Sequence, residues 1–230
     1  MLLHDQVFLV TGAAGDLAAS VIQVFQAQGA RLALTGHSPA ELETRARAWG
    51  VPGWPAELTD PEQVNGLVNQ VIAELGQLDG VLHLAGGFAA GPLAEADQRT
   101  YQQLFQRNVE SLFVVMRATL PLMLKQGHGF LAGVSAGHGY RGEAAGAGIY
   151  AAAKSAVSAL LRSAALEAAP QGVRVAVLYP MGTIDTEGNR RAMPNADFSH
   201  WIDPKSLAEA LLFAATRPTN GRVVEIPIYP

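Results

Sequence analysis

The segment Q-V-F-L-V-T-G-A-A-G-D-L-A, residues 6–18, decides the fold because it passes from an apolar strand pattern through a turn of small residues into a helical pattern. Gly12 and Gly15 allow the backbone of this turn to approach a phosphate group closely. The start of the helix offers free N–H groups and the positive end of the helix dipole. The turn therefore indicates a dinucleotide site, although two glycines that serve only a tight turn explain the same residues nearly as well.

The rest of the chain repeats this alternation of strand and helix. Further helices are expected at residues 39–49, 61–75, 97–125 and 149–168, and strands at residues 6–11, 31–35, 53–58, 81–85, 129–135, 173–179 and 223–228. Because a parallel crossover needs a helix, this order predicts a doubly wound (Rossmann) α/β fold with a parallel seven-stranded sheet and helices on both faces. We expect one domain over residues 1–230, with a lid-like insertion at about 183–204, where a polar segment is too long for an ordinary turn.

Composition excludes several classes of function. The chain has 230 residues, no cysteine, 16% charged residues and a net charge of −4, so it offers no disulfide, thiolate nucleophile or zinc–thiolate site. It has no Lys/Arg cluster for nucleic acid and no run of about 20 apolar residues for a bilayer. The first residues do not resemble a secretory signal, and the histidines lack metal-ligand spacing. We therefore expect a cytoplasmic protein without metal, membrane or nucleic-acid partner.

Tyr150 and Lys154 lie one turn apart on the same face of the helix at residues 149–168. An ammonium group beside a phenol lowers the pKa of the phenol, which a proton donor to a carbonyl needs near neutral pH. Taken alone, a solvated tyrosine and lysine on a helix surface would be the commoner explanation. The pair gains weight from the other motifs of the chain.

Four segments in order resemble the short-chain dehydrogenase/reductase family: the glycine turn, A-G at 85–86, R-N-V-E-S-L-F around Asn108, and Y-A-A-A-K at 150–154. The resemblance covers essentially the whole chain. It implies hydride transfer between a nicotinamide cofactor and a small-molecule carbonyl or alcohol. Tyr150 would be the general acid/base, Lys154 would hold the nicotinamide ribose, and Asn108 would position a water. Ser135 would bind the substrate oxygen, unless Ala136 occupies the place of the family's serine and Tyr150 acts alone.

The resemblance also implies which residues contact the cofactor: Gly12, Ala14, Gly15, Asp16, Leu17, His37, Ser38, Glu57, Leu58, Ala85, Gly86, Gly87, Tyr150, Lys154, Pro180, Ile184 and Thr186. Asp16 and Ala18 replace two glycines of the family's turn, and the Asp16 carboxylate would repel a phosphate. Gly36 stands where an acid would select NAD, and His37 and Ser38 can donate to a 2′-phosphate. The expected cofactor is NADP, with NAD possible and with NADPH binding stronger in mildly acidic solution, where His37 is charged.

The segment from residue 183 to 201 is similar to that of quinonoid dihydropteridine reductases. Such an activity is one alternative, and a non-catalytic dinucleotide-binding regulatory protein is another. In this segment Arg190 or Arg191 could reach the substrate, but we expect at least one to pair with a neighbouring carboxylate. His138 and Tyr140 could line the pocket. The family commonly pairs the helices at 97–125 and 149–168 between subunits, which implies a homodimer or homotetramer.

Overall fold

The computed structural model describes residues 1–230 and contains one parallel sheet of six strands in the order β2-β1-β3-β4-β5-β6. The strands are β1 (Val7–Thr11), β2 (Arg31–Thr35), β3 (Gly80–His83), β4 (Gly129–Val134), β5 (Val173–Pro180) and β6 (Glu225–Ile228). Thr11 lies opposite both Thr35 and His83 in the register of the sheet. The carboxyl ends of these strands therefore meet at one edge, where the glycine turn begins.

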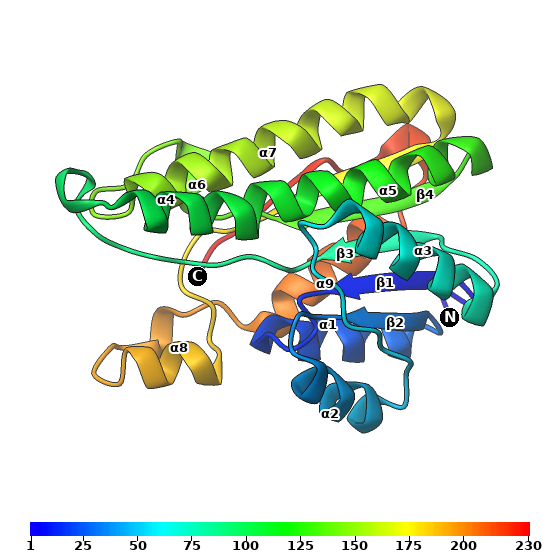
Figure 1. Cartoon of the computed structure of the whole chain (residues 1–230), viewed down its shortest axis with the longest axis horizontal. Helices are drawn as coiled ribbons and strands as arrows, with labels where there is room; N and C mark the ends of the chain where they lie inside the picture. Colours follow the sequence, from blue (N-terminus) through cyan, green and yellow to red (C-terminus); the bar gives the residue numbers. More distant parts are fainter.

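Helices cover both faces of the sheet (Figure 1). They are α1 (Asp16–Ala27), α2 (Pro39–Trp49), α3 (Pro61–Leu75), α4 (Gln98–Phe105), α5 (Ser111–Gln126), α6 (Gly137–Arg141), α7 (Gly148–Ala168), α8 (Glu187–Ala192) and α9 (Pro204–Ala215). Apolar side chains of α3, α5 and α7 fill one core layer, and those of α1 and α9 fill the other. The doubly wound fold is thus confirmed. None of the helices combines the length and apolarity needed to cross a membrane.

The prediction of seven strands is wrong, because residues 53–58 form only a single bridge from Gly53 to Leu34. The segment still runs along β2, where the Leu34 N–H donates to the Pro52 carbonyl at 2.9 Å and the Trp54 N–H donates to the Leu34 carbonyl at 3.0 Å. Pro55 has no N–H group, so it limits the extension of a regular ladder. The sheet consequently ends at β2 with a partial extension in place of a strand.

The long helix expected at residues 97–125 is interrupted by a π turn at Gln106–Glu110, between α4 and α5. Asn108 lies in this turn, and its side-chain Nδ2 donates to the Leu104 carbonyl at 2.9 Å. A side chain that bonds to the carbonyl four residues earlier competes with the regular helical bond. The interruption therefore has a local cause, and it fixes the direction in which Asn108 points.

The expected insertion at about 183–204 contains α8 and a 3₁₀ turn at Phe198–His200. Thr186 caps α8 by accepting a hydrogen bond from the Asn189 N–H at 3.2 Å. Phe198 and Trp201 pack against each other with their ring centroids 4.6 Å apart. In Figure 1, α8 lies on the side of α1 and away from α6.

Candidate active site

Helix α7 presents Tyr150 and Lys154 beside the end of β4. The Lys154 Nζ donates to the Val134 carbonyl at 2.9 Å and lies 5.8 Å from the ring centroid of Tyr150. Burial lowers the pKa of Lys154 to about 8 and raises the pKa of Tyr150 to about 12. The direction is opposite to the expected lowering of the phenol pKa, because burial raises it and the Lys154 ammonium donates to β4.

Asn108 joins the turn at residues 85–87 to this pair. Its Nδ2 donates to the Gly87 carbonyl at 3.0 Å, and its Oδ1 accepts from the Gly87 N–H at 3.2 Å. A Cβ atom at Gly86 would lie 2.7 Å from the Asn108 Oδ1 and 3.3 Å from the Lys154 Nζ. Only glycine fits at this contact, so the structure brings the expected residues Gly86, Gly87, Asn108 and Lys154 together.

A buried histidine that the sequence interpretation left without a role connects this cluster to the glycine turn. His83 Nδ1 lies 3.1 Å from the Thr11 Oγ1, and its Nε2 lies 3.3 Å from the Ser111 Oγ. The Ser111 hydroxyl donates to the Arg107 carbonyl at 2.8 Å, so the network assigns the proton of His83 to Nε2. Burial lowers the pKa of His83 to about 3, and the side chain is neutral. In the sequence, the only indication that His83 belongs to the site was its position near the end of an expected strand.

Ser135 is enclosed beneath α7, where its side chain is not open to a substrate. It is 2% exposed, and its hydroxyl donates to the Lys154 carbonyl at 2.9 Å. The Ser158 hydroxyl donates to the Ser135 Oγ at 2.9 Å. A Cβ atom at Gly139 would lie 2.5 Å from the same oxygen. In this arrangement, the single proton of the Ser135 hydroxyl is already used within the protein.

Two aromatic side chains flank the Tyr150 ring. Phe88 makes an edge-to-face contact with a centroid separation of 4.9 Å, and the His138 ring lies at 5.8 Å. Phe88 is 65% exposed, and His138 is also exposed. Tyr140 packs instead on Tyr179 at 5.0 Å. Of the two residues expected to line the pocket, only His138 contacts the candidate catalytic tyrosine.

Asp16 is the first residue of α1, and its carboxylate is directed toward the inserted segment. Its Oδ2 accepts a hydrogen bond from the Gly188 N–H at 2.9 Å. A Cβ atom at Gly188 would lie 2.6 Å from that oxygen, so a larger residue there would displace the carboxylate. Gly12 adopts a φ of +65°, and a Cβ atom there would lie 2.7 Å from the Ala85 nitrogen. These contacts connect the glycine turn both to α8 and to the 85–87 turn.

The remaining expected cofactor residues surround the same edge of the sheet. His37 is exposed, and Ser38 occupies the N-cap of α2 without a side-chain capping bond. Leu58 is 8% exposed, and the exposed Glu57 accepts from the Thr59 hydroxyl at 2.9 Å. The others take these positions: Ala14 and Gly15 precede α1, Leu17 lies in its first turn, Ala85 follows β3, Pro180 ends β5, and Ile184 and Thr186 precede α8.

Both lid arginines have carboxylate partners, which confirms the expected pairing. Arg190 forms a two-point contact with Asp185 at 2.5 and 2.8 Å, and its guanidinium lies 4.6 Å from the Phe198 ring centroid. This hydrogen bond lowers the pKa of Asp185. Arg191 pairs with Glu187 at 2.6 Å. The lid arginines thus stabilise their own segment.

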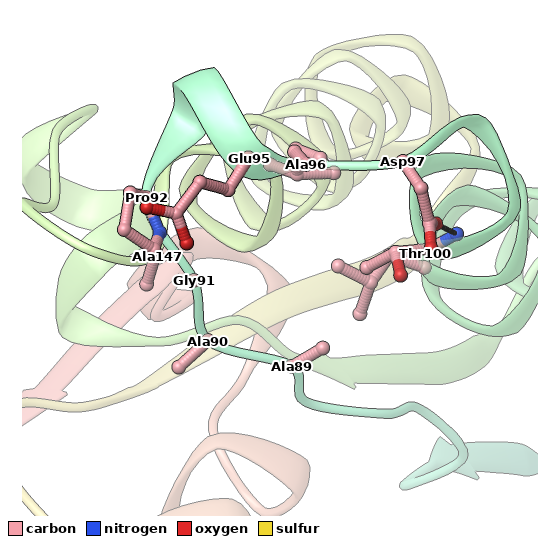
Figure 2. A pocket seen from close by; sticks show the side chains of 11 residues that line it. Ala89, Ala90, Gly91, Pro92, Glu95, Ala96, Asp97, Thr100 and Ala147 are labelled. Carbon is pink, nitrogen blue, oxygen red and sulfur yellow. Dashed lines mark hydrogen bonds between the residues drawn. The ribbon is translucent and has the colours of Figure 1, made fainter.

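A cavity of about 260 Å³ lies between the loop after β3 and the start of α4 (Figure 2). It is lined mainly by small side chains, with Glu95 on one side and Thr100 on the other. The loop is held to the segment before α7 by a hydrogen bond from the Gly91 N–H to the Gly146 carbonyl at 2.7 Å. Tyr150 and Lys154 do not line this cavity, but Ile149, the residue before Tyr150, does.

The chain belongs to the short-chain dehydrogenase family, whose model matches residues 6–197. It is similar to an uncharacterized oxidoreductase of Staphylococcus saprophyticus, with 28% identity over 239 residues that cover 99% of this chain and 98% of the relative. An uncharacterized oxidoreductase of Staphylococcus aureus is also 28% identical, over 231 residues and the same shares of the two chains. These full-length matches define the class as an oxidoreductase family.

Solved structures share the fold at lower identity. Levodione reductase superimposes with a TM-score of 0.86 at 24% identity, covering 99% of this chain and 97% of that one. A metagenomic short-chain oxidoreductase in complex with NADP gives a TM-score of 0.84 at 23% identity, covering 100% and 99%. ElxO with NADP bound gives 0.88 at 22% identity, covering 97% and 96%. At these identities, the likeness establishes the architecture of the chain.

Proposed function

We propose that this protein is an NADP-dependent oxidoreductase that transfers a hydride between the nicotinamide and a carbonyl or alcohol carbon. The observation that carries the proposal is the pair formed by half-buried Tyr150 and buried Lys154, held beside the 85–87 turn that Asn108 clamps. This cluster lies at the carboxyl edge of a parallel sheet, where doubly wound folds bind their ligands. Membership of the family and the NADP-bound neighbours support the cofactor class.

The residues present fit a dinucleotide. Gly12 and Gly86 occupy contacts with no room for a side chain, which leaves bare backbone along the edge. Helix α1 begins after Gly15 without a side-chain cap, and the Ala18 N–H donates to the Gly15 carbonyl, so the N–H groups of Asp16 and Leu17 would be the donors to a diphosphate. Lys154 would hold the nicotinamide ribose, and Ile184 and Thr186 would lie toward the nicotinamide. A bound nicotinamide cofactor would supply or accept the hydride.

Tyr150 and Lys154 would have different roles in proton transfer. The raised pKa of Tyr150 keeps its phenol protonated at neutral pH, so the hydroxyl can donate to a substrate oxygen that gains charge. With a pKa of about 8, Lys154 is mostly charged at pH 7 and would stabilise the phenolate that remains. Phe88 and His138 hold the phenol ring from two sides, which restricts its orientation.

The engaged hydroxyl of Ser135 favours a site without a serine donor. In that arrangement Ala136 takes the family serine's place, and Tyr150 alone contacts the substrate oxygen. Dihydropteridine reductases also lack the serine, so reduction of a quinonoid dihydropterin is the second candidate activity. The two candidates share the tyrosine, the lysine and the cofactor, and they differ in the substrate.

The test is a turnover assay of the purified protein with NADPH or NADH and a panel of ketones, aldehydes, alcohols with NADP, and a quinonoid dihydropterin. We expect cofactor oxidation with at least one carbonyl, and dominant activity on the dihydropterin would favour the second candidate. Cofactor binding without turnover across the whole panel would support a regulatory dinucleotide-binding protein and contradict the proposed enzyme.

A further inference from the structure

Arg45 of α2 is a cation without a carboxylate partner beside the glycine turn. Its Nη2 donates to the Ala14 carbonyl at 3.5 Å, the long end of the hydrogen-bond range, and the side chain is half-buried. No Asp or Glu oxygen lies within 4.0 Å of its guanidinium, whereas Arg47 on the same helix pairs with Glu43 at 2.7 Å. Most of the five donors of Arg45 are therefore available to an anion.

The end of β2, next to the glycine turn, has open space at Gly36 and a free hydroxyl group at Ser38. A Cβ atom at Gly36 would have no atom within 4 Å, and Ser38 makes no capping bond with its hydroxyl. The Ala13 N–H donates to the Thr35 carbonyl at 3.1 Å, which holds the end of β2 against the glycine turn. Arg45 contacts Ala14, the residue after Ala13, and Ser38 follows Thr35 by three positions, so both belong to the two segments that this bond joins.

The acid of the glycine turn is directed elsewhere. The Asp16 Oδ2 accepts from the Gly188 N–H at 2.9 Å, so its carboxylate is engaged with α8. Residues 11–18 of the turn contain the acidic Asp16 and no lysine or arginine. In the folded chain, Arg45 of α2 contacts Ala14, which lies 31 positions earlier in the sequence. It thereby places a positive charge beside the turn.

We propose that Arg45 determines cofactor specificity by binding the 2′-phosphate of NADPH. This inference rests on the proposed function, because it assigns a residue to the cofactor of that same site. A guanidinium can bind a phosphate through two parallel hydrogen bonds, and it gains little from the neutral 2′-hydroxyl of NADH. Ser38 and His37, at the start of α2, would donate to the remaining phosphate oxygens. The assignment places the specificity residue in the interior of a helix, outside the glycine motif.

The test measures binding of 2′,5′-ADP and 5′-AMP by calorimetry, so its readout is independent of turnover. Arg45→Ala should weaken 2′,5′-ADP binding by roughly 10- to 100-fold, the range of a hydrogen bond to a charged group, and leave 5′-AMP within about twofold. Arg47→Ala is the matched control, because Arg47 is exposed and already paired, and it should change neither affinity. Arg45→Lys should retain part of the preference, since it keeps the charge and loses the two-point geometry.

Titrations of NADPH and NADH, followed by nicotinamide fluorescence, complete the experiment. Arg45→Ala should lose most of the preference for NADPH while its unfolding temperature stays near that of the wild type. An unchanged NADPH preference in this variant would overturn the role of Arg45 and leave the proposed function standing. Equal binding of NADPH and NADH by the wild-type protein would also overturn the role of Arg45 without affecting the proposed function. Wild-type protein that binds neither dinucleotide would overturn the proposed function together with this inference.

Discussion

Tyr150 is half-buried, and its ring contacts Phe88 and His138. Tyr150→Phe keeps the ring contacts with Phe88 and His138 and removes only the proton donor. We predict that turnover falls by roughly 100-fold or more, while NADPH binding is retained. Tyr140→Phe is a matched control on neighbouring α6, where the ring packs on Tyr179. Near-normal steady-state turnover in Tyr150→Phe would exclude the proposed proton transfer.

Ser135 and Ser158 both lie 2.9 Å from the carbonyl oxygen of Lys154. If they act by fixing α7, their effects are coupled, because the Ser158 hydroxyl donates to the Ser135 Oγ, which in turn donates to the Lys154 carbonyl. We predict that Ser135→Ala and Ser158→Ala each lower kcat by roughly 3- to 10-fold, an effect of about 1 kcal/mol, and that the double variant is less impaired than the product of the two. A large loss in Ser135→Ala with normal Ser158→Ala activity would instead show that Ser135 contacts the substrate.

The lowered pKa of Lys154 implies that the free energy of unfolding depends on pH when no cofactor is added. Its ordinary value of 10.5 falls to about 8 through burial, so between pH 8 and 10 the unfolded chain binds a proton that the folded chain has lost. Stability therefore rises with pH across this window, whereas below pH 8 the full cost of the buried charge is present. The rise is on the order of 2 to 3 kcal/mol by pH 10. Above pH 10, the raised pKa of Tyr150 acts in the opposite direction.

Urea unfolding at several pH values between 7 and 10 measures this effect. Lys154→Met has no ammonium to titrate, so its stability should lack the rise seen in the wild type. Parallel curves for the two proteins would show that Lys154 does not titrate in this window.

At the scale of elements, apolar periodicity predicted the helices and strands wherever burial alone determines them. It was correct for the bounds of α2 and α3. It was wrong for residues 53–58, where a proline limits the ladder, and it missed the π turn at Asn108. The π turn depends on a side chain bonding to the carbonyl four residues earlier, and periodicity carries no information about such bonds.

The contact between Asp16 and Gly188 predicts how firmly α8 is held. Removing the carboxylate removes a charge-assisted hydrogen bond, so Asp16→Ala should let α8 open more often, by roughly fivefold for a loss of about 1 kcal/mol. Trypsin cleavage after Arg190 and Arg191 should accelerate accordingly. Glu209→Ala, which removes an exposed carboxylate on α9, is the control and should cleave at the wild-type rate. Equal rates for Asp16→Ala and wild type would show that the contact does not restrain α8.

At the scale of the whole molecule, the alternation of strands and helices was sufficient to predict the parallel sheet, and with it the edge where the candidate site is expected. The motifs then identified Tyr150, Lys154 and Asn108, which the structure places together. The contacts of Asp16 with Gly188 and of Arg45 with Ala14 join segments that are far apart in the sequence. Such pairings depend on how helices cover the sheet, so no local pattern could have indicated them.

Exposed apolar side chains on α5 and α7 predict that the protein forms an oligomer. Phe113 on α5 is 49% exposed and Leu166 on α7 is 72% exposed, and both residues lie in the helices, at 97–125 and 149–168, that the sequence led us to expect between subunits. Because apolar side chains gain from removal from water, we predict a dimer or tetramer at micromolar concentration by light scattering, and Phe113→Glu should shift it toward the monomer. Phe213→Glu is the matched control: Phe213 is 50% exposed on α9, and Arg217 lies 4.3 Å from its ring centroid. A monomeric wild type, or dissociation caused equally by Phe213→Glu, would contradict an interface built on α5 and α7.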